Sequence, residues 1–159
     1  MKTLILKIIL MLPIPLESRH VESFLQSHGI RARVEVVNLS EPLVLGNQLQ
    51  YFYKLRQAFN RKRNEHIHIL TEPFMQDGQE FMLGFAVKAE KISMSVWNSE
   101  NIHAEQREIH SWKIMLHELG HQLSLHHSTG CTSVMDADVG RCSNIAELGF
   151  SKEELKRMK

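Results

Sequence analysis

The sequence predicts one α+β domain, in which a mixed, twisted β-sheet is packed by helices. Three observations support this prediction. The chain has 159 residues, which is enough for one domain with a sizeable core and too few for two ordinary domains. Short apolar or alternating segments typical of strands are interspersed with segments of helical periodicity. No repeat or Pro/Gly/Ser-rich linker divides the chain, so we treat residues 1–159 as a single domain.

The first quarter of the chain predicts a strand, a helix and a second strand. The apolar run Leu4–Leu12 is typical of a buried strand, and two prolines follow it. Glu17–Ser27 predicts a helix that Gly29 closes. Arg33–Leu39 alternates valines with charged residues, which predicts the second strand.

The middle of the chain predicts another helix and three more strands. Leu49–Arg63 carries apolar residues at helical spacing and ends in a basic cluster, which is favourable near a helix C-terminus. His66–Leu70 alternates histidine with isoleucine, so we expect a strand with both histidines, His66 and His68, on its outer face; a second metal site there stays open. Phe81–Lys88 and Ile92–Trp97 predict two strands joined by a short turn.

A long helix is predicted from about His103 to Leu125. One stripe of apolar residues recurs at steps of three and four, namely Ile109, Trp112, Leu116, Leu119 and Leu123. Three histidines run beside this stripe, so we expect an apolar side in the core and a histidine side that faces something polar. Residues 128–159 predict a small, loop-rich part that ends in a short helix, opened by the capping box Ser151-Lys-Glu-Glu154.

Composition excludes several classes of protein. The 19 Lys and Arg against 18 Asp and Glu give a formal net charge of +1, which removes the simple electrostatic argument for binding nucleic acid or an anionic membrane. Two cysteines cannot form an all-cysteine zinc site or a dense disulfide scaffold. Ten histidines leave ample nitrogen for a metal site.

The N-terminal apolar run bears on the compartment. Lys7 interrupts the run, and no small-x-small cleavage site follows it. The run is also shorter than the roughly 18 apolar residues that a membrane span requires. We therefore expect a cytoplasmic protein, with export left open.

The segment His117-Glu-Leu-Gly-His121 carries an H-E-x-x-H motif on the predicted long helix. Residues four apart lie one turn apart on the same face, so both imidazoles can bind one ion. Zinc accepts neutral imidazole nitrogen and prefers tetrahedral geometry. Glu118 is offset around the helix, which lets it reach a water at the metal instead of the metal itself.

A catalytic zinc needs a third protein ligand and an open fourth position. His127 follows His121 by six residues, beyond the predicted helix end, so the chain must turn back to deliver it. His126, one residue out of register, is an alternative ligand. Glu147 is a more distant alternative, because some zinc proteases with the same motif use a glutamate as third ligand.

The stretch from His117 to His127, followed by Ser-Val-Met135, resembles the metzincin zinc proteases, and within that clan the archaemetzincins. Weaker similarity lies at Leu12-Pro13, Leu55-Arg56-Gln57 and Phe81-Met-Leu-Gly-Phe-Ala86. The resemblance covers most of the chain, but only residues 117–135 are specific. It implies a single metzincin-like zinc-protease domain, with His117, His121 and His127 as zinc ligands, Glu118 as general base and Met135 as the Met-turn residue beneath the metal.

The sequence departs from this family at the third residue after the second histidine. The family has glycine there, which permits a left-handed turn, whereas this chain has Ser124. A serine in that conformation costs of order 1 kcal/mol. The departure leaves open whether the chain turns at Ser124 or slightly later.

A second departure concerns the family's four cysteines, which bind a structural zinc. Ser128 and Ser133 stand where two of them would lie, and the later Cys-x-x-Cys pair is missing. Because hydroxyls are poor zinc ligands, we expect the second zinc to be absent. Cys131 and Cys142 fall on other positions; they close a disulfide loop if the protein is exported, or stay reduced in the cytosol.

The resemblance implies a zinc-dependent endopeptidase or aminopeptidase. We expect one catalytic zinc, a monomer, peptide or protein substrates, and neither nucleic acid nor membrane as partner. By analogy, Ile92–Val96 is the sheet edge along which an extended substrate pairs. The alternative is a zinc-stabilised peptide-binding module with little or no turnover.

Overall fold

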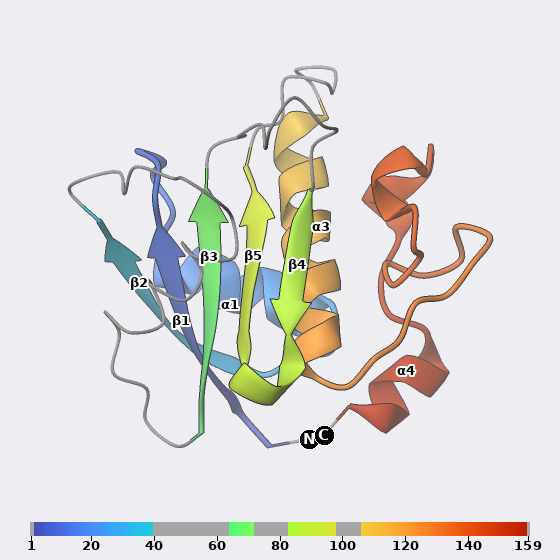
Figure 1. Ribbon diagram of the computed structural model, residues 1–159, viewed down its shortest axis with the longest axis horizontal. Coiled ribbons are helices and arrows are strands. Elements are labelled where there is room, and N and C mark those ends of the chain that lie inside the picture. The colour runs from blue at the N-terminus through green and yellow to red at the C-terminus, as the bar shows by residue number, and fades with distance from the viewer. Residues whose placement is uncertain (1, 40–63, 72–82, 98–105, 159) are drawn as a thin grey trace.

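The computed structural model describes residues 2–39, 64–71, 83–97 and 106–158. Within these ranges, five strands form one sheet in the order β2-β1-β3-β5-β4 (Figure 1). The strands are β1 (Leu4–Leu10), β2 (Ala32–Asn38), β3 (Glu65–Thr71), β4 (Gly84–Val87) and β5 (Ile92–Val96). All neighbours pair in parallel except β4 and β5, which are antiparallel. The sheet is therefore mixed, as the sequence predicts.

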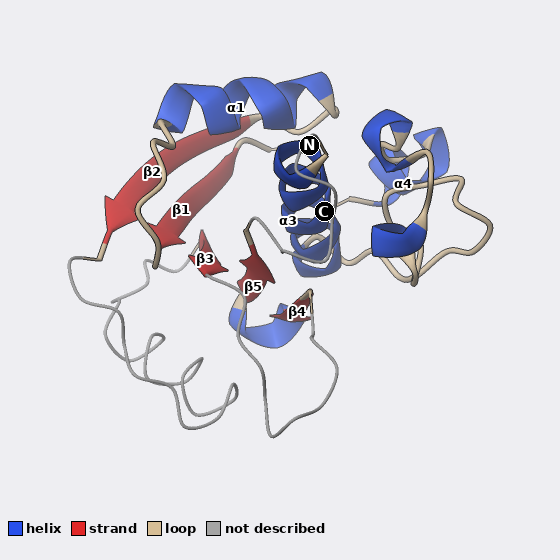
Figure 2. Ribbon diagram, turned by 90° about the horizontal axis from the view of Figure 1, so that it is seen from above, coloured by secondary structure: helices blue, strands red, loops and turns tan. Residues whose placement is uncertain are grey.

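Two helices, α1 (Ser18–Ser27) and α3 (Arg107–Gln122), lie on the same side of the sheet (Figure 2). Beyond α3 the chain forms the short 3-10 helices η2 (Val139–Arg141) and η3 (Ile145–Glu147), followed by α4 (Lys152–Arg157). Another 3-10 turn, η1 (Lys88–Glu90), joins β4 to β5. These elements confirm the α+β prediction. The predicted helix at 49–63, with its segment 55–57, lies outside the described residues.

The apolar run at the N-terminus becomes an inner strand of the sheet. β1 lies between β2 and β3, and its residues Ile8, Ile9 and Leu10 are at most 1% exposed. An inner strand is buried on both faces where the sheet is covered, which explains why the second half of this run is continuously apolar, whereas Ile5 is exposed and Lys7 is partly buried in the first half. The strand ends at Leu10, two residues before its predicted end.

The predicted edge strand is wrong. In the described sheet β5 is flanked by β3 on one side and β4 on the other, and all five of its residues are buried. β4 forms the outer strand instead, paired from Gly84 opposite Ser95 to Val87 opposite Ile92. The short connection through η1 folds β4 back as a hairpin onto β5, which is why β4, the earlier strand in sequence, takes the outer place.

The predicted orientation of His66 and His68 is also wrong. Both side chains lie on the side of β3 that faces α3, where His66 contacts Gln122 and His68 is fully buried. Serine hydroxyls on β5 bond both ring nitrogens of His68, so its burial leaves neither nitrogen without a partner. The opposite side of β3 carries Ile67 and Ile69.

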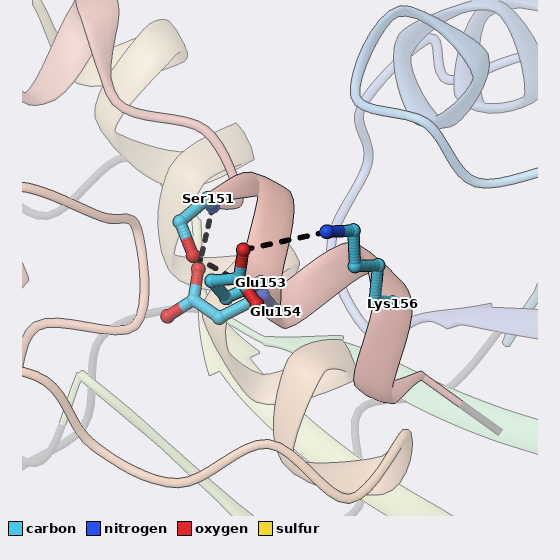
Figure 3. A network of polar contacts seen from close by, with 4 residues as sticks. All are labelled: Ser151, Glu153, Glu154 and Lys156. Carbon is cyan, nitrogen blue, oxygen red and sulfur yellow. Dashed lines mark hydrogen bonds and ion pairs between the residues drawn. The ribbon is translucent and has the colours of Figure 1, made fainter.

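The helix ends follow the predicted signals closely. Gly29 has φ +84° just after α1, which is the left-handed conformation expected of a closing glycine. The capping box of α4 is formed in both directions (Figure 3): Glu154 N donates to Ser151 Oγ at 3.2 Å, and Ser151 N donates to Glu154 Oε2 at 2.7 Å. α3 runs from Arg107 to Gln122, within the predicted range.

Two further findings concern the cysteines and the apolar character of the helices. Cys131 and Cys142 form a disulfide, so the structure has the first of the two alternatives left open for them. The bond closes a loop that contains Met135 and η2. Among the described residues, no helix combines the length and apolar character that a membrane crossing demands.

Candidate metal centre and cleft

Three histidines predicted as metal ligands come together at the C-terminal end of α3. His117 and His121 occupy successive turns of the helix, as the motif requires. Ser124 adopts φ +77°, and its N–H donates to His121 O at 3.1 Å, so the chain turns at Ser124 itself. The turn brings His127 back beside the helix, where its ring lies 4.6 Å from that of His121.

The Nε2 atoms of these three rings converge. His121 Nε2 lies 3.1 Å from His117 Nε2 and 3.0 Å from His127 Nε2. Two ligands of a tetrahedral zinc at 2.0–2.1 Å are separated by about 3.3 Å. The spacing of the three nitrogens is therefore close to what one zinc ion requires, and the three residues form a potential metal-binding group.

The other ring nitrogens fix the tautomers. His117 Nδ1 lies 2.7 Å from Val134 O, and His121 Nδ1 lies 3.0 Å from Leu125 O. Because a carbonyl oxygen only accepts, both Nδ1 atoms must carry the hydrogen and donate. In the neutral rings the Nε2 atoms then present lone pairs to each other at 3.1 Å, an arrangement that a shared cation stabilises.

Burial favours the neutral form of His117 and His121. Burial lowers the pKa of His117 to about 4, an effect that the bond to Val134 O only partly offsets. The pKa of His121 is likewise lowered, chiefly by burial. Neutral imidazole is the form that binds metal, so the rings do not need to lose a proton first at neutral pH.

Glu118 lies between α3 and the outer strand. Its side chain is buried, and burial raises the pKa of its carboxyl to about 8. A Cβ placed on Gly84 would lie 2.7 Å from Glu118 Oε1, so only a glycine at this point of β4 leaves room for the carboxyl. Glu118 thus lies beside the three histidines, with β4 against its carboxyl.

The segment after His127 packs against α3. Met135 is fully buried, and a Cβ on Gly120 would overlap its Sδ atom, so α3 and Met135 are in close contact at that glycine. Asp136 follows, and its carboxylate accepts hydrogen bonds from the N–H groups of Cys131 and Asp138 at 2.7 and 2.8 Å. These two backbone hydrogen bonds lower the pKa of the Asp136 carboxyl. The carboxylate holds this turn together.

The two alternative ligands, His126 and Glu147, do not join the three histidines. His126 is exposed and does not belong to the potential metal-binding group that His117, His121 and His127 form in the described part of the chain. Glu147 lies in η3 and is exposed, and it too falls outside that group. The geometry therefore favours His127 as third ligand.

A cleft of about 680 Å³ opens in front of the histidines. β4 and η1 form one wall through Leu83, Gly84, Phe85, Ala86 and Lys88. The opposite wall comes from the C-terminal part, through Ala137, Asp138, Val139, Gly140 and Arg141. The floor is α3, with Ile114, His117, Glu118 and His121.

Sequence reasoning missed two contributors to this site. The carbonyl of Val134, which orients His117, is a backbone group and has no signature in the sequence. Gly84 lies in the segment 81–86 that resembles the archaemetzincins, but this resemblance does not predict its contact with Glu118. A glycine inside a predicted strand often marks such a close approach, and that signal was available.

No protein-family model matches the chain, and no curated protein is similar to it in sequence. Its fold is nevertheless shared with several solved structures. An archaemetzincin from Methanopyrus kandleri aligns at a TM-score of 0.65 and 17% identity, covering 97% of this chain and 92% of that one. An archaemetzincin from Archaeoglobus fulgidus, complexed with malonate, aligns at a TM-score of 0.62 and 14% identity, covering 98% of this chain and 100% of that one. A zinc-dependent peptidase from Methanocorpusculum labreanum aligns at a TM-score of 0.57 and 14% identity, covering 97% of this chain and 93% of that one.

Proposed function

We propose that this protein, whose chain has the archaemetzincin fold, is a zinc-dependent peptidase with His117, His121 and His127 as the metal ligands. The observation that carries the proposal is the facing pair of Nε2 lone pairs on His117 and His121, with the third Nε2 of His127 beside them. The fold similarity, over nearly the whole of the two archaemetzincins and the zinc-dependent peptidase, supports the same conclusion.

A bound zinc ion supplies Lewis acidity, which activates a water and polarises the peptide carbonyl. Glu118 acts as general base: its carboxylate takes a proton from the attacking water and then passes it to the departing amine. Met135 packs beneath the ligands and supports their positions.

The substrate is proposed to be an extended peptide that pairs with β4. β4 is one of the two outer strands of the described sheet, and its residues line the cleft next to Glu118. A peptide that adds to this strand gains main-chain hydrogen bonds and passes in front of the histidines. The apolar side chains of Leu83, Ile114 and Val139 offer a surface for one apolar side chain of the substrate.

One zinc ion per chain is proposed. Ser128 and Ser133 occupy positions where the related family carries cysteines, and the Ser133 hydroxyl donates to Glu154. Cys131 and Cys142 are joined to each other, so their sulfurs are not thiolate ligands. A hydroxyl–carboxylate bond and a disulfide therefore cross-link the region that a second metal would hold.

The test combines metal analysis with turnover. We expect about one zinc per chain and cleavage of a peptide library that stops when a chelator removes the zinc. His127→Ala should lose zinc and activity, whereas the matched variant His126→Ala should keep both. A chain that binds no zinc contradicts the proposal, and a chain that binds zinc without cleaving any peptide favours the non-catalytic binding module.

A further inference from the structure

A layer of mostly buried polar residues lies between α3 and the two strands β3 and β5, beside the apolar core. Its members are His66 and His68 on β3, Ser93 and Ser95 on β5, and Gln122 on α3. Four of the five are buried: His68 and Ser93 are fully buried, Ser95 is 1% exposed and Gln122 is 5% exposed. On the opposite face of the same two strands the middle residues are apolar, namely Ile67, Ile69, Ile92 and Met94, and the polar Glu65 and Thr71 lie at the two ends of β3. The hydrogen-bonded polar group at the centre of these strands thus lies on the face toward the helix that carries the three histidines.

The hydrogen bonds of this layer have one consistent direction. Gln122 Nε2 donates to Ile67 O at 2.9 Å and to Ser93 Oγ at 2.6 Å, so His66 Nδ1 must donate to Gln122 Oε1 at 2.8 Å. Since the Ser93 oxygen accepts from Gln122, its hydrogen is free to donate to His68 Nδ1 at 2.5 Å. His68 Nε2 then donates to Ser95 Oγ at 2.8 Å.

This chain of bonds ends next to the proposed general base. Ser95 pairs with Gly84 across the β4–β5 ladder, and Gly84 is the residue against which the Glu118 carboxyl packs. At the other end, Gln122 follows Glu118 by four residues and so lies on the same face of α3. The layer therefore fixes both the helix face that carries Glu118 and the strand that the carboxyl contacts.

We infer that His68 is a positioning residue for Glu118, acting through Ser93 and Gln122 on α3 and through Ser95 on the strand beside Gly84. His68 does not touch the metal ligands, and it does not line the cleft. Directional hydrogen bonds define the rotation and the height of α3 over the sheet, whereas apolar contacts allow small shifts between well-packed alternatives. A shift of about 1 Å at a general base can lower a rate by as much as about 10²-fold.

This inference rests on the proposed function, and three variants test it with two readouts. His68→Leu removes the central bonds of the layer. We expect kcat to fall at least tenfold, with KM and the zinc dissociation constant changed less than about threefold. His68→Gln keeps one donor and one acceptor on a side chain of similar reach, and it should recover most of kcat.

The third variant separates positioning from simple stability. In His68→Leu/Ser95→Ala the Ser95 hydroxyl that lost its partner is also gone, while Ser93 still accepts from Gln122, so resistance to denaturant should recover relative to His68→Leu alone. We expect kcat to stay low, because the directional bonds are still missing. If kcat recovers together with resistance to denaturant, His68 has a purely structural role and the inference is wrong.

The second readout does not depend on turnover. Acetohydroxamic acid binds zinc through its oxygens and donates a hydrogen bond to a neighbouring carboxylate, so its affinity reports where Glu118 lies. Its dissociation constant should rise in His68→Leu and not in Ile69→Ala, which creates a cavity on the opposite face of β3. Equal affinities in His68→Leu and the parent would overturn the inference. A parent that cleaves no peptide would instead refute the proposed function, while this binding readout would still test His68.

Discussion

The hydroxyl of Ser133 donates a hydrogen bond of 2.6 Å to the carboxylate of Glu154, across 21 residues of sequence. Ser133 Oγ also accepts from Met135 N at 3.0 Å, and Glu154 Oε2 also accepts from Ser151 N at 2.7 Å. The same carboxylate therefore caps α4 and holds the segment whose Val134 carbonyl accepts from His117. The bond between this hydroxyl and this carboxylate cross-links two distant parts of the chain without a metal ion.

Loss of this cross-link should destabilise the protein. We expect Ser133→Ala to lower the free energy of unfolding by about 1–2 kcal/mol, because a half-buried carboxylate loses a charge-assisted hydrogen bond. Glu153→Gln is the matched control, since Glu153 makes only an exposed ion pair with Lys156 at 3.5 Å (Figure 3) and should change the stability by less than about 0.5 kcal/mol. Urea denaturation measures both. Equal losses of stability in the two variants would show that the Ser133–Glu154 bond stabilises the fold no more than an exposed ion pair does.

The contact between Gly120 and Met135 predicts a second effect. Gly120→Ala adds a Cβ that would overlap Met135 Sδ and lie 3.0 Å from the Phe150 ring. Alanine is the better helix former by about 1 kcal/mol, yet overpacking costs about 1–3 kcal/mol, so we expect a net loss of stability. Gly149→Ala meets nothing closer than His28 at 3.4 Å and serves as control. A Gly120→Ala protein with a raised thermal midpoint would contradict the described packing.

The left-handed turn at Ser124 predicts a stabilising substitution. At φ +77° a side chain is strained, so Ser124→Gly should raise the free energy of unfolding by about 1 kcal/mol. Ser124→Ala keeps the Cβ and should bring no such gain. Chemical denaturation of the two variants beside the parent checks the prediction; a gain in the alanine variant alone would place the turn elsewhere.

Burial of His68 predicts how stability depends on pH. Burial lowers its pKa from 6.5 to about 3, so between these values the unfolded chain binds a proton that the folded chain does not. Stability should therefore fall as the pH drops below about 6.5, with His68 contributing up to about 1.4 kcal/mol per pH unit. Urea denaturation near pH 7 and near pH 4.5 should show a smaller difference for His68→Gln than for the parent. An equal difference would mean that His68 is not buried as a neutral ring.

The parts of the molecule that sequence predicts well depend on neighbours in the chain. The H-E-x-x-H motif, the capping box at Ser151 and the closing Gly29 all act within one or two helical turns, and the structure has each of them. The apolar run at β1 is likewise local, and it predicts a buried strand without reference to its partners.

The failures concern contacts between distant segments. Alternation along β3 places His66 and His68 on one face, but it does not say which face α3 will cover. That depends on Ser93, Ser95 and Gln122, which lie 25 or more residues away. The order of β4 and β5 in the sheet similarly depends on a hairpin that no periodicity in the sequence specifies.

The central claim is that three histidines hold a zinc ion whose peptidase chemistry needs the carboxylate of Glu118. The most direct test compares Glu118→Gln with the parent for bound zinc and for peptide hydrolysis, in the same preparations. We predict equal zinc content in both proteins and a loss of hydrolysis of about 10²–10⁴-fold in the variant, because an amide of the same shape cannot take the proton. Hydrolysis by Glu118→Gln at the rate of the parent would contradict the account.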